Sequence, residues 1–201
     1  IYGALGTVNM AQIAERMVEL PSDVQLVIHV LLVLAFAIKA AVFPLSFWLP
    51  DSYPTAPAPV TAVFAGLLTK VGVYALIRPA TQLFHESDLN PPLLIVALAT
   101  MLVGILGAVA QAELKRILSY TLVSHVGYMI FGLAIATEEA VGATLYYMVH
   151  HIVVQTTLFL AVGLIERRAG SPSILRVKGL STAAPLLVRL VKSHSSSSLL
   201  G

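Results

Sequence analysis

Long apolar runs separated by short polar stretches dominate the pattern of this chain. Five runs reach the length of about 20 mostly apolar residues that a helix needs to cross a bilayer. Each should be α-helical, because an open strand would leave unpaired backbone groups in lipid. The pattern therefore predicts an all-α fold, a polytopic transmembrane helix bundle of about five transmembrane helices, at residues 23–50, 58–78, 91–111, 114–137 and 139–166.

The segments that flank these spans have different patterns. Residues 9–20 (NMAQIAERMVEL) have the spacing of a short amphipathic helix outside the bilayer, and residues 1–8 fit the end of a preceding span. After about Leu187, basic residues and a serine run interrupt the apolar pattern, which favours an aberrant or disordered tail. The predicted organisation is an entry segment (1–22), a five-helix transmembrane domain (23–168), and a cytoplasmic linker with its tail (169–201).

Composition supports a membrane location and excludes several classes of site. Charged residues make up 11% of the chain and hydrophobic residues 58%, whereas soluble domains carry roughly 25% charged residues. The chain has no cysteine, so thiolate metal sites and cysteine nucleophiles are excluded. Basic residues gather at the ends of spans rather than in one patch, which argues against a nucleic-acid partner. We expect no cofactor and no metal.

The distribution of basic residues predicts the orientation. Spans alternate in direction, so the polar connections fall on two sides of the membrane. One side carries six basic residues, and the other carries two together with seven acidic residues. The six are Lys115, Arg116, Arg167, Arg168, Arg176 and Lys178, and the two are Arg16 and Arg78. Because cytoplasmic loops are enriched in Lys and Arg, we expect a multi-pass protein of the cell (plasma or inner) membrane with the span ends near Asp51, Lys115 and Arg167 in the cytoplasm.

Polar residues inside the spans are the candidates for function. Lys39 and Lys70 lie in mid-span, where a lysine costs roughly 2.5–3.5 kcal/mol on insertion scales. At 1.5 Å per residue, these lysines, His125 and Gln155 lie roughly 16–18 Å from the predicted cytoplasmic ends of their spans. That depth is close to the middle of a hydrocarbon core about 30 Å thick, and His151 lies about one turn further out. We expect a polar layer across the bundle.

Helical spacing places further polar groups beside these residues. Tyr147 shares a face with His151 and Gln155, and Thr121 shares a face with His125 and Tyr128. Ser124 and His150 are secondary candidates. A lysine away from water can release as well as hold a proton, and an imidazole can pass one between its two nitrogens. Histidines in membranes are also structural hydrogen-bonding residues, which is the interpretation favoured for His29 and His150.

Pro44 predicts a break in the first span. Proline removes a backbone donor and clashes with the carbonyl one turn earlier. Irregular backbone at membrane depth is tolerated where it lines protein or water, and transporters place broken helices at their ion sites. We therefore expect a broken helix near Lys39–Pro44.

Three stretches resemble a known family of membrane proteins. FAIKAAVFPLSFWLPDSYPTAPAPVTAVFAGLLTKVGVYALIR resembles the seventh and eighth helices of antiporter-like subunits, AELKRILSYTLVSHVGYMIFGLA their tenth helix, and MVHHIVVQTTLFLAVG their eleventh. The resemblance covers residues 1–186 and is greatest to the D-type subunits of Mrp multisubunit Na+/H+ antiporters. The proton-pumping membrane subunits of respiratory complex I (NADH:quinone oxidoreductase) belong to the same family.

The resemblance implies a fold and a set of roles. The family fold has fourteen helices with two inverted five-helix repeats, so the chain, which begins with Ile1, is expected to be a fragment of a larger antiporter-like subunit. Lys39 matches the lysine of the broken seventh helix, Lys70 the relay lysine of the eighth, His125 the tenth-helix histidine and His151 the eleventh-helix histidine. Gln155 stands where many relatives have lysine, and an amide orders water without carrying charge.

These observations lead to one main functional hypothesis and two alternatives. The main one is a proton-translocating subunit of a multisubunit monovalent cation (Na+)/H+ antiporter, a secondary transporter rather than an enzyme. Its partners would be other subunits of the assembly, the lipid bilayer, H+ and Na+. The first alternative is a proton-pumping membrane subunit of NADH:quinone oxidoreductase, and the second is a scaffold bundle without an ion path.

Overall fold

The computed structural model describes residues 1–84 and 89–174, and in this part the chain is helical. Five helices are long and apolar enough to span a membrane, which confirms the predicted bundle. The tail predicted beyond Leu187 lies outside the described residues, as do Arg176 and Lys178. The five helices are α3 (Ser22–Ala40), α5 (Ala58–Gln82), α6 (Asn90–Val109), α7 (Leu114–Ile135) and α8 (Glu138–Ala169).

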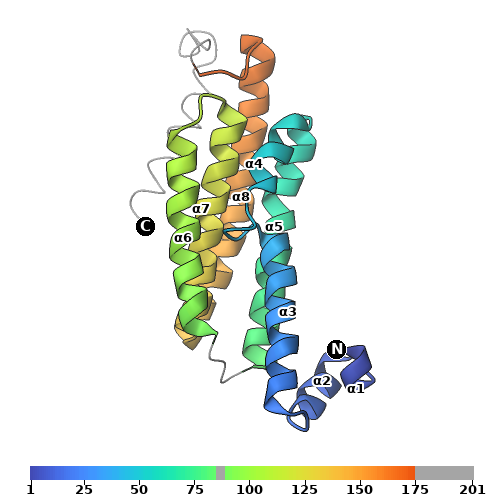
Figure 1. Cartoon of the computed structure of the whole chain (residues 1–201). Coiled ribbons are helices and arrows are strands. Elements are labelled where there is room, and N and C mark those ends of the chain that lie inside the picture. Colours follow the sequence, from blue (N-terminus) through green and yellow to red (C-terminus); the bar gives the residue numbers. More distant parts are fainter. Residues whose placement is uncertain (85–88, 175–201) are drawn as a thin grey trace.

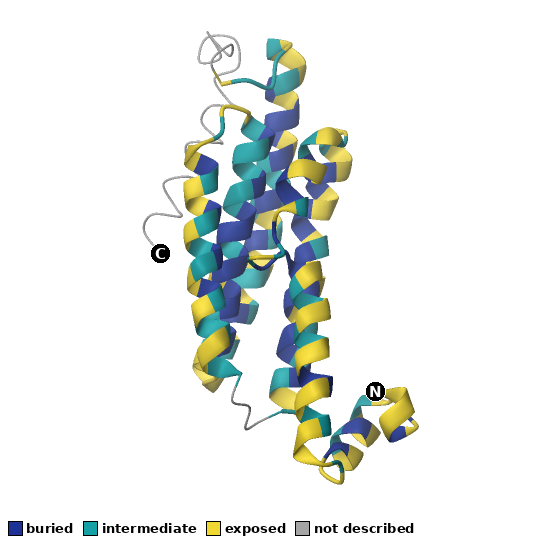
Figure 2. Ribbon diagram, in the orientation of Figure 1, coloured by how far each residue is buried: buried dark blue, intermediate teal, exposed yellow. Residues whose placement is uncertain are grey.

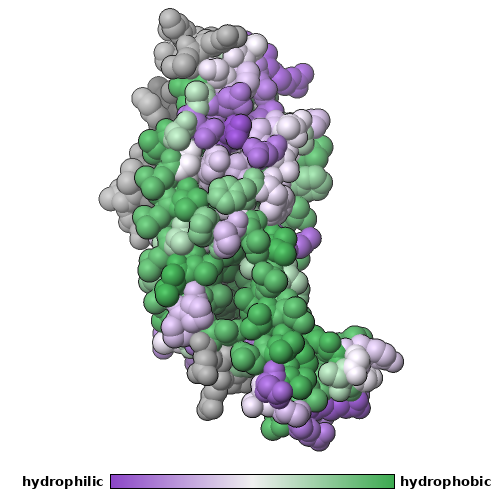
Figure 3. Space-filling view, in the orientation of Figure 1, coloured by the Kyte–Doolittle hydropathy of each residue, from purple (hydrophilic) through white to green (hydrophobic). Residues whose placement is uncertain are grey.

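The long helices stand side by side in an order that differs from their order in the chain (Figure 1). Packing runs from α6 to α7, from α7 to α8, from α8 to α5 and from α5 to α3. Buried residues concentrate on α5 and α7, whereas α3 and α6 expose most of their apolar side chains (Figure 2). Figure 3 shows this apolar surface with hydrophilic residues gathered toward its two ends. The exposed apolar faces are suited to lipid or to neighbouring protein.

Helix α8 is longer than the membrane requires. Its 32 residues correspond to about 48 Å, against a hydrocarbon core of about 30 Å. It begins with the hydroxyl of Thr137 accepting from the backbone N–H of Ala140 and ends at Gly170, which adopts the left-handed conformation. The residues beyond Gly170 turn back, and Glu113 pairs with Ser173 in an isolated antiparallel bridge.

Two short helices precede the first span. Helix α1 (Tyr2–Leu5) packs on α2 (Met10–Met17), and the Asn9 side chain caps α2 by accepting from two backbone N–H groups. Leu5, Ile13 and Met17 form a small apolar cluster with Ile28 of α3. A helix therefore forms within residues 9–20, at Met10–Met17, and its place outside the bilayer stays a prediction.

The first predicted span is interrupted. Helix α3 ends at Ala40, and Ala41 adopts the left-handed conformation with φ 62°. Residues 41–47 are non-helical, after which come the short helix α4 (Trp48–Ser52) and the 3-10 turn η1 (Tyr53–Thr55). The last helical residue, Ala40, is the residue four positions before Pro44, whose carbonyl the proline ring would meet in a continuous helix.

Glycines allow α6 and α7 to approach closely. A Cβ atom added at Gly104 would lie 2.4 Å from the backbone nitrogen of Ser124. One added at Gly127 would lie 2.7 Å from the backbone nitrogen of Met101. Because backbone cannot move aside as a side chain can, these two positions fix the distance between the helices.

We therefore expect Gly104→Ala to force α6 and α7 apart and to lower the free energy of unfolding by about 1–3 kcal/mol, the usual cost of overpacking. Gly142→Ala is the matched control, since an added Cβ there meets nothing within 4 Å. Thermal unfolding in detergent compares the two variants. Equal melting temperatures for both would contradict the close contact.

Candidate functional site

Lys70 lies in the interior of the bundle. Its side chain comes from α5, the residue is 2% exposed, and its Nζ donates to the carbonyl oxygen of Ala65 at 2.7 Å. The salt bridges found in the described residues, Lys115–Glu166 and Arg116–Asp51, do not involve it. A buried amine held by a backbone carbonyl rather than by a carboxylate is costly to keep charged.

Two histidines on neighbouring helices meet beside Lys70. The ring centroids of His125 on α7 and His151 on α8 are 4.7 Å apart. His125 Nδ1 is hydrogen-bonded to the hydroxyl of Tyr147. Both ring nitrogens of His151 are buried and have no hydrogen-bond partner among the described residues. Both histidines lie on helices that pack against α5, the helix that carries Lys70.

Further aromatic side chains extend from the cluster of Lys70, His125 and His151 to the surface of the bundle. The rings of His125, Tyr128 and Tyr147 form a triangle, with centroid separations of 6.0 Å from His125 to Tyr147, 6.1 Å from His125 to Tyr128 and 6.5 Å from Tyr128 to Tyr147. The ring centroid of His150 lies 6.4 Å from that of Tyr147. Tyr128 and His150 are exposed in this chain. The polar layer is therefore closed at Lys70 and open at Tyr128 and His150.

Three other predicted site residues have hydrogen bonds to backbone carbonyls, which account for polar side chains inside the bundle. Gln155 is 2% exposed, and its amide donates to the carbonyl of Leu118 at 3.0 Å. The hydroxyl of Thr121 donates to the same carbonyl at 2.9 Å. Ser124 donates to Met101 of α6 at 3.1 Å. The bonds of Gln155 and Ser124 join two helices, whereas that of Thr121 lies within α7. Whether the three residues also conduct protons stays a prediction.

Lys39 lies apart from the cluster. It is exposed on α3 within this chain, while its backbone packs against α5. A Cβ added at Gly72 would lie 2.6 Å from the nitrogen of Ala40 and 3.0 Å from the carbonyl carbon of Lys39. The end of α3 therefore contacts α5 at Gly72, two residues after Lys70. The side chain of Lys39, however, does not join the cluster. Its role also stays a prediction.

Two side chains that the sequence pattern does not single out stabilise the break in α3. The hydroxyl of Thr100 on α6 accepts from the backbone N–H of Phe43 at 3.1 Å and donates to Val96 at 2.6 Å. The indole N–H of Trp48 donates to the carbonyl of Ile38 at 3.1 Å. Each partners a backbone group near the point where the helix stops. Nothing in the local pattern marks Thr100, because its partner is 57 positions away.

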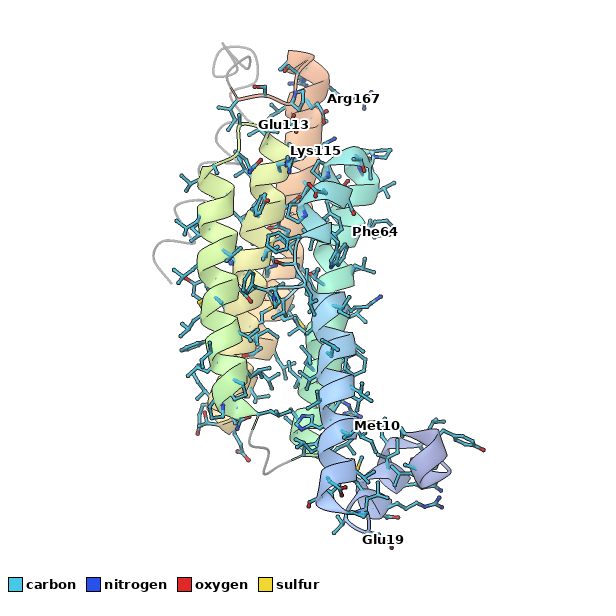
Figure 4. The ribbon with its side chains drawn as sticks, in the orientation of Figure 1. Met10, Glu19, Phe64, Glu113, Lys115 and Arg167 are labelled. Atoms are coloured by element: carbon cyan, nitrogen blue, oxygen red, sulfur yellow. The ribbon has the colours of Figure 1, made fainter. Side chains whose placement is uncertain are left out.

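The span ends predicted to share one side do lie at one end of the bundle. Figure 4 shows Glu113, Lys115 and Arg167 together, with Met10 and Glu19 at the opposite end. Lys115 pairs with Glu166 at 2.7 Å, and Arg116 pairs with Asp51 of α4 at 2.9 Å. The charges at this end thus join α4, α7 and α8.

A comparison with protein families matches the chain over residues 1–197 to the family described as NADH:quinone oxidoreductase/Mrp antiporter, TM. The chain belongs to this family. Membership confirms the resemblance found in the sequence and agrees with a multi-pass membrane protein. The broken α3, the lysine of α5 and the histidines of α7 and α8 are the structural elements on which that resemblance rested.

Individual members of the family agree with this assignment. The chain is 46% identical over 190 residues to the D-type Na(+)/H(+) antiporter subunit of Alkalihalophilus pseudofirmus, covering 93% of the chain and 38% of that protein. Among solved structures, it matches a chain of the Mrp complex from Dietzia sp. with a TM-score of 0.86 and 39% identity, covering 92% of this chain and 35% of that one.

A respiratory member of the family is similar as well. A chain of respiratory complex I from Thermus thermophilus matches with a TM-score of 0.77 and 32% identity, covering 83% of this chain and 36% of that one. The chain thus spans a little over a third of the relatives it matches. The D-type antiporter subunit shares more of its sequence than the complex I chain does.

The contact of Thr100 with Phe43 predicts a stability effect. Thr100→Val leaves the Phe43 N–H without its acceptor, and a buried unsatisfied donor costs about 1–3 kcal/mol. Trp48 is the single tryptophan of the chain and lies at the break, so its fluorescence can follow thermal unfolding there. We expect the Thr100→Val variant to melt at a lower temperature than the wild type. Thr157→Val is the control, because that exposed hydroxyl bonds its own helix at Val153. A shift of the same size in both variants would argue against the tether.

Proposed function

We propose that this chain is the proton-conducting part of a D-type subunit of an Mrp Na+/H+ antiporter. The observation that carries the proposal is the buried Lys70 beside His125 and His151, three groups on three helices that differ in the ease with which they hold a proton. The 46% identity to a D-type antiporter subunit supports this choice within the family. The complete subunit would move protons inward in exchange for Na+, with other subunits of the complex as partners.

The proposed mechanism is electrostatic. A proton held as the Lys70 ammonium is stabilised by the Ala65 carbonyl. Its release toward the histidines leaves Lys70 neutral and removes the repulsion that a positive charge exerts on its neighbours. Tyr147, bonded to His125, and the unpartnered nitrogens of His151 offer the next sites for a proton or for water. Lys39, on the broken α3, would be the switch that passes charge to Lys70.

We expect Lys70→Ala and Lys39→Ala each to abolish sodium-dependent proton movement, because each removes a group that holds the proton. The full-length protein in its complex is assayed in inverted membrane vesicles, where added sodium collapses an imposed pH gradient reported by a dye. Arg168→Ala, which removes an exposed charge at the end of α8, should transport at the wild-type rate. Wild-type rates in either lysine variant would contradict the proposed path.

A second candidate function is proton pumping in a respiratory complex, and the match to complex I favours it. The same residues would conduct, with redox chemistry in partner subunits as the driving force. The vesicle assay separates the two candidates. Acidification driven by NADH, with no response to sodium, would identify the respiratory function.

We further propose that the end of the bundle containing Asp51, Lys115 and Arg167 faces the cytoplasm. The excess of basic residues there supports this orientation. The chain has no cysteine, so Arg167→Cys and Glu138→Cys introduce single reporters at the two ends of α8.

A membrane-impermeant maleimide should label Arg167→Cys in inverted vesicles and Glu138→Cys in right-side-out vesicles or intact cells. Each variant should label at least about tenfold faster from its expected side, because the charged reagent does not cross the hydrocarbon core. The reverse result would invert the orientation.

A further inference from the structure

Thr69 lies next to Lys70 on α5 and has an unusual hydroxyl. The residue is fully buried, and its Oγ1 has no hydrogen-bond partner among the described residues. A threonine inside a helix normally donates to the carbonyl three or four positions earlier. Thr81 on the same helix does so to Ile77 at 2.9 Å, and Thr100 on α6 does so to Val96 at 2.6 Å.

The acceptor that Thr69 would normally use is already occupied. Four positions before Thr69 is Ala65, whose carbonyl oxygen accepts the Lys70 ammonium at 2.7 Å. In a regular α-helix the same oxygen also accepts the backbone N–H of Thr69. A carbonyl oxygen has two lone pairs, so the ammonium and the backbone together use its capacity and leave the hydroxyl without a partner.

We infer that Thr69 is a positioning residue for Lys70, because its hydroxyl and the Lys70 ammonium compete for the carbonyl oxygen of Ala65. With the ammonium on Ala65, the hydroxyl stays unpartnered. When the lysine side chain leaves Ala65, the hydroxyl takes the vacated position and satisfies the carbonyl. Thr69 therefore makes the departure of Lys70 easier. The inference rests on the proposed function, in which Lys70 must give up its proton.

The surroundings define where the lysine can go. Helices α7 and α8 both pack against α5 and carry His125 and His151, whose ring centroids lie 4.7 Å apart. His150, next to His151 on α8, is exposed. On α3, Lys39 exposes its side chain, and its backbone meets α5 at Gly72. Movement of the Lys70 amine away from Ala65 toward α7 and α8 brings it to groups that can accept a proton.

Thr69→Val tests the inference, since valine keeps the branched shape and removes the hydroxyl. Without its competitor the ammonium is held more strongly on Ala65, so proton release requires a higher pH. We expect sodium-dependent proton transport in vesicles containing the full complex to fall about fivefold, the effect of a single hydrogen bond. The loss should be largest at acidic pH and shrink as the pH rises.

Two other variants make the result specific. Thr69→Ser restores a hydroxyl and should transport as the wild type does. Thr81→Val makes the same change at an exposed position of the same helix and should also leave transport unchanged. Should Thr69→Val fail to assemble with its partners, Thr69→Ala removes the same hydroxyl and carries the same expectation.

Wild-type transport by Thr69→Val at every pH would overturn the inference, and so would an equal loss at every pH or a failure of Thr69→Ser to restore transport. Lys70→Ala is measured in parallel. Loss of transport in Lys70→Ala with wild-type behaviour of Thr69→Val overturns the inference alone, whereas wild-type transport in Lys70→Ala overturns the proposed function together with it.

Discussion

The buried amine of Lys70 is the constraint around which this bundle is organised. A charged side chain in a membrane interior is costly unless protein groups or water replace its hydration. In the described residues the amine of Lys70 has a hydrogen bond to a backbone carbonyl on its own helix, and its helix packs against α7 and α8, which carry the two histidines. Since the charge is only weakly compensated, small changes in these partners decide whether the amine holds its proton. Helix α5, which carries Lys70, packs between α3 and α8, so the amine is enclosed by protein.

The break in α3 poses a second problem of the same kind. Ending a helix inside a membrane frees backbone N–H and C=O groups that lipid cannot satisfy. Here Thr100 takes the N–H of Phe43 and Trp48 donates to the carbonyl of Ile38. The irregular segment is thus held from α6 on one side and from α4 on the other. A break supported in this way is a fixed element of the structure rather than a weak point.

The sequence was sufficient to predict the spans and the break in the first of them. Hydropathy determines the spans because a bilayer demands apolar length, and helical spacing determines that Tyr147 and His151 share a face. The direction in which α3 presents Lys39 depends on how the helix is rotated by its neighbours, which no local pattern encodes. Thr69 and Thr100 were missed for a related reason. Whether a buried hydroxyl serves its own helix or a distant backbone group depends on which carbonyls the fold leaves free.

Helix α8 has a mechanical consequence. It runs without interruption from Glu138 to Ala169, so His151 and Glu166 belong to one stiff helix that is longer than the hydrocarbon core is thick. His151 lies about 27 Å along this helix from its end. Because an unbroken helix bends little over such a distance, a tilt of the end that carries Glu166 would also displace His151. Such a tilt would change the spacing between the His151 and His125 rings, which lie 4.7 Å apart, without any change in secondary structure.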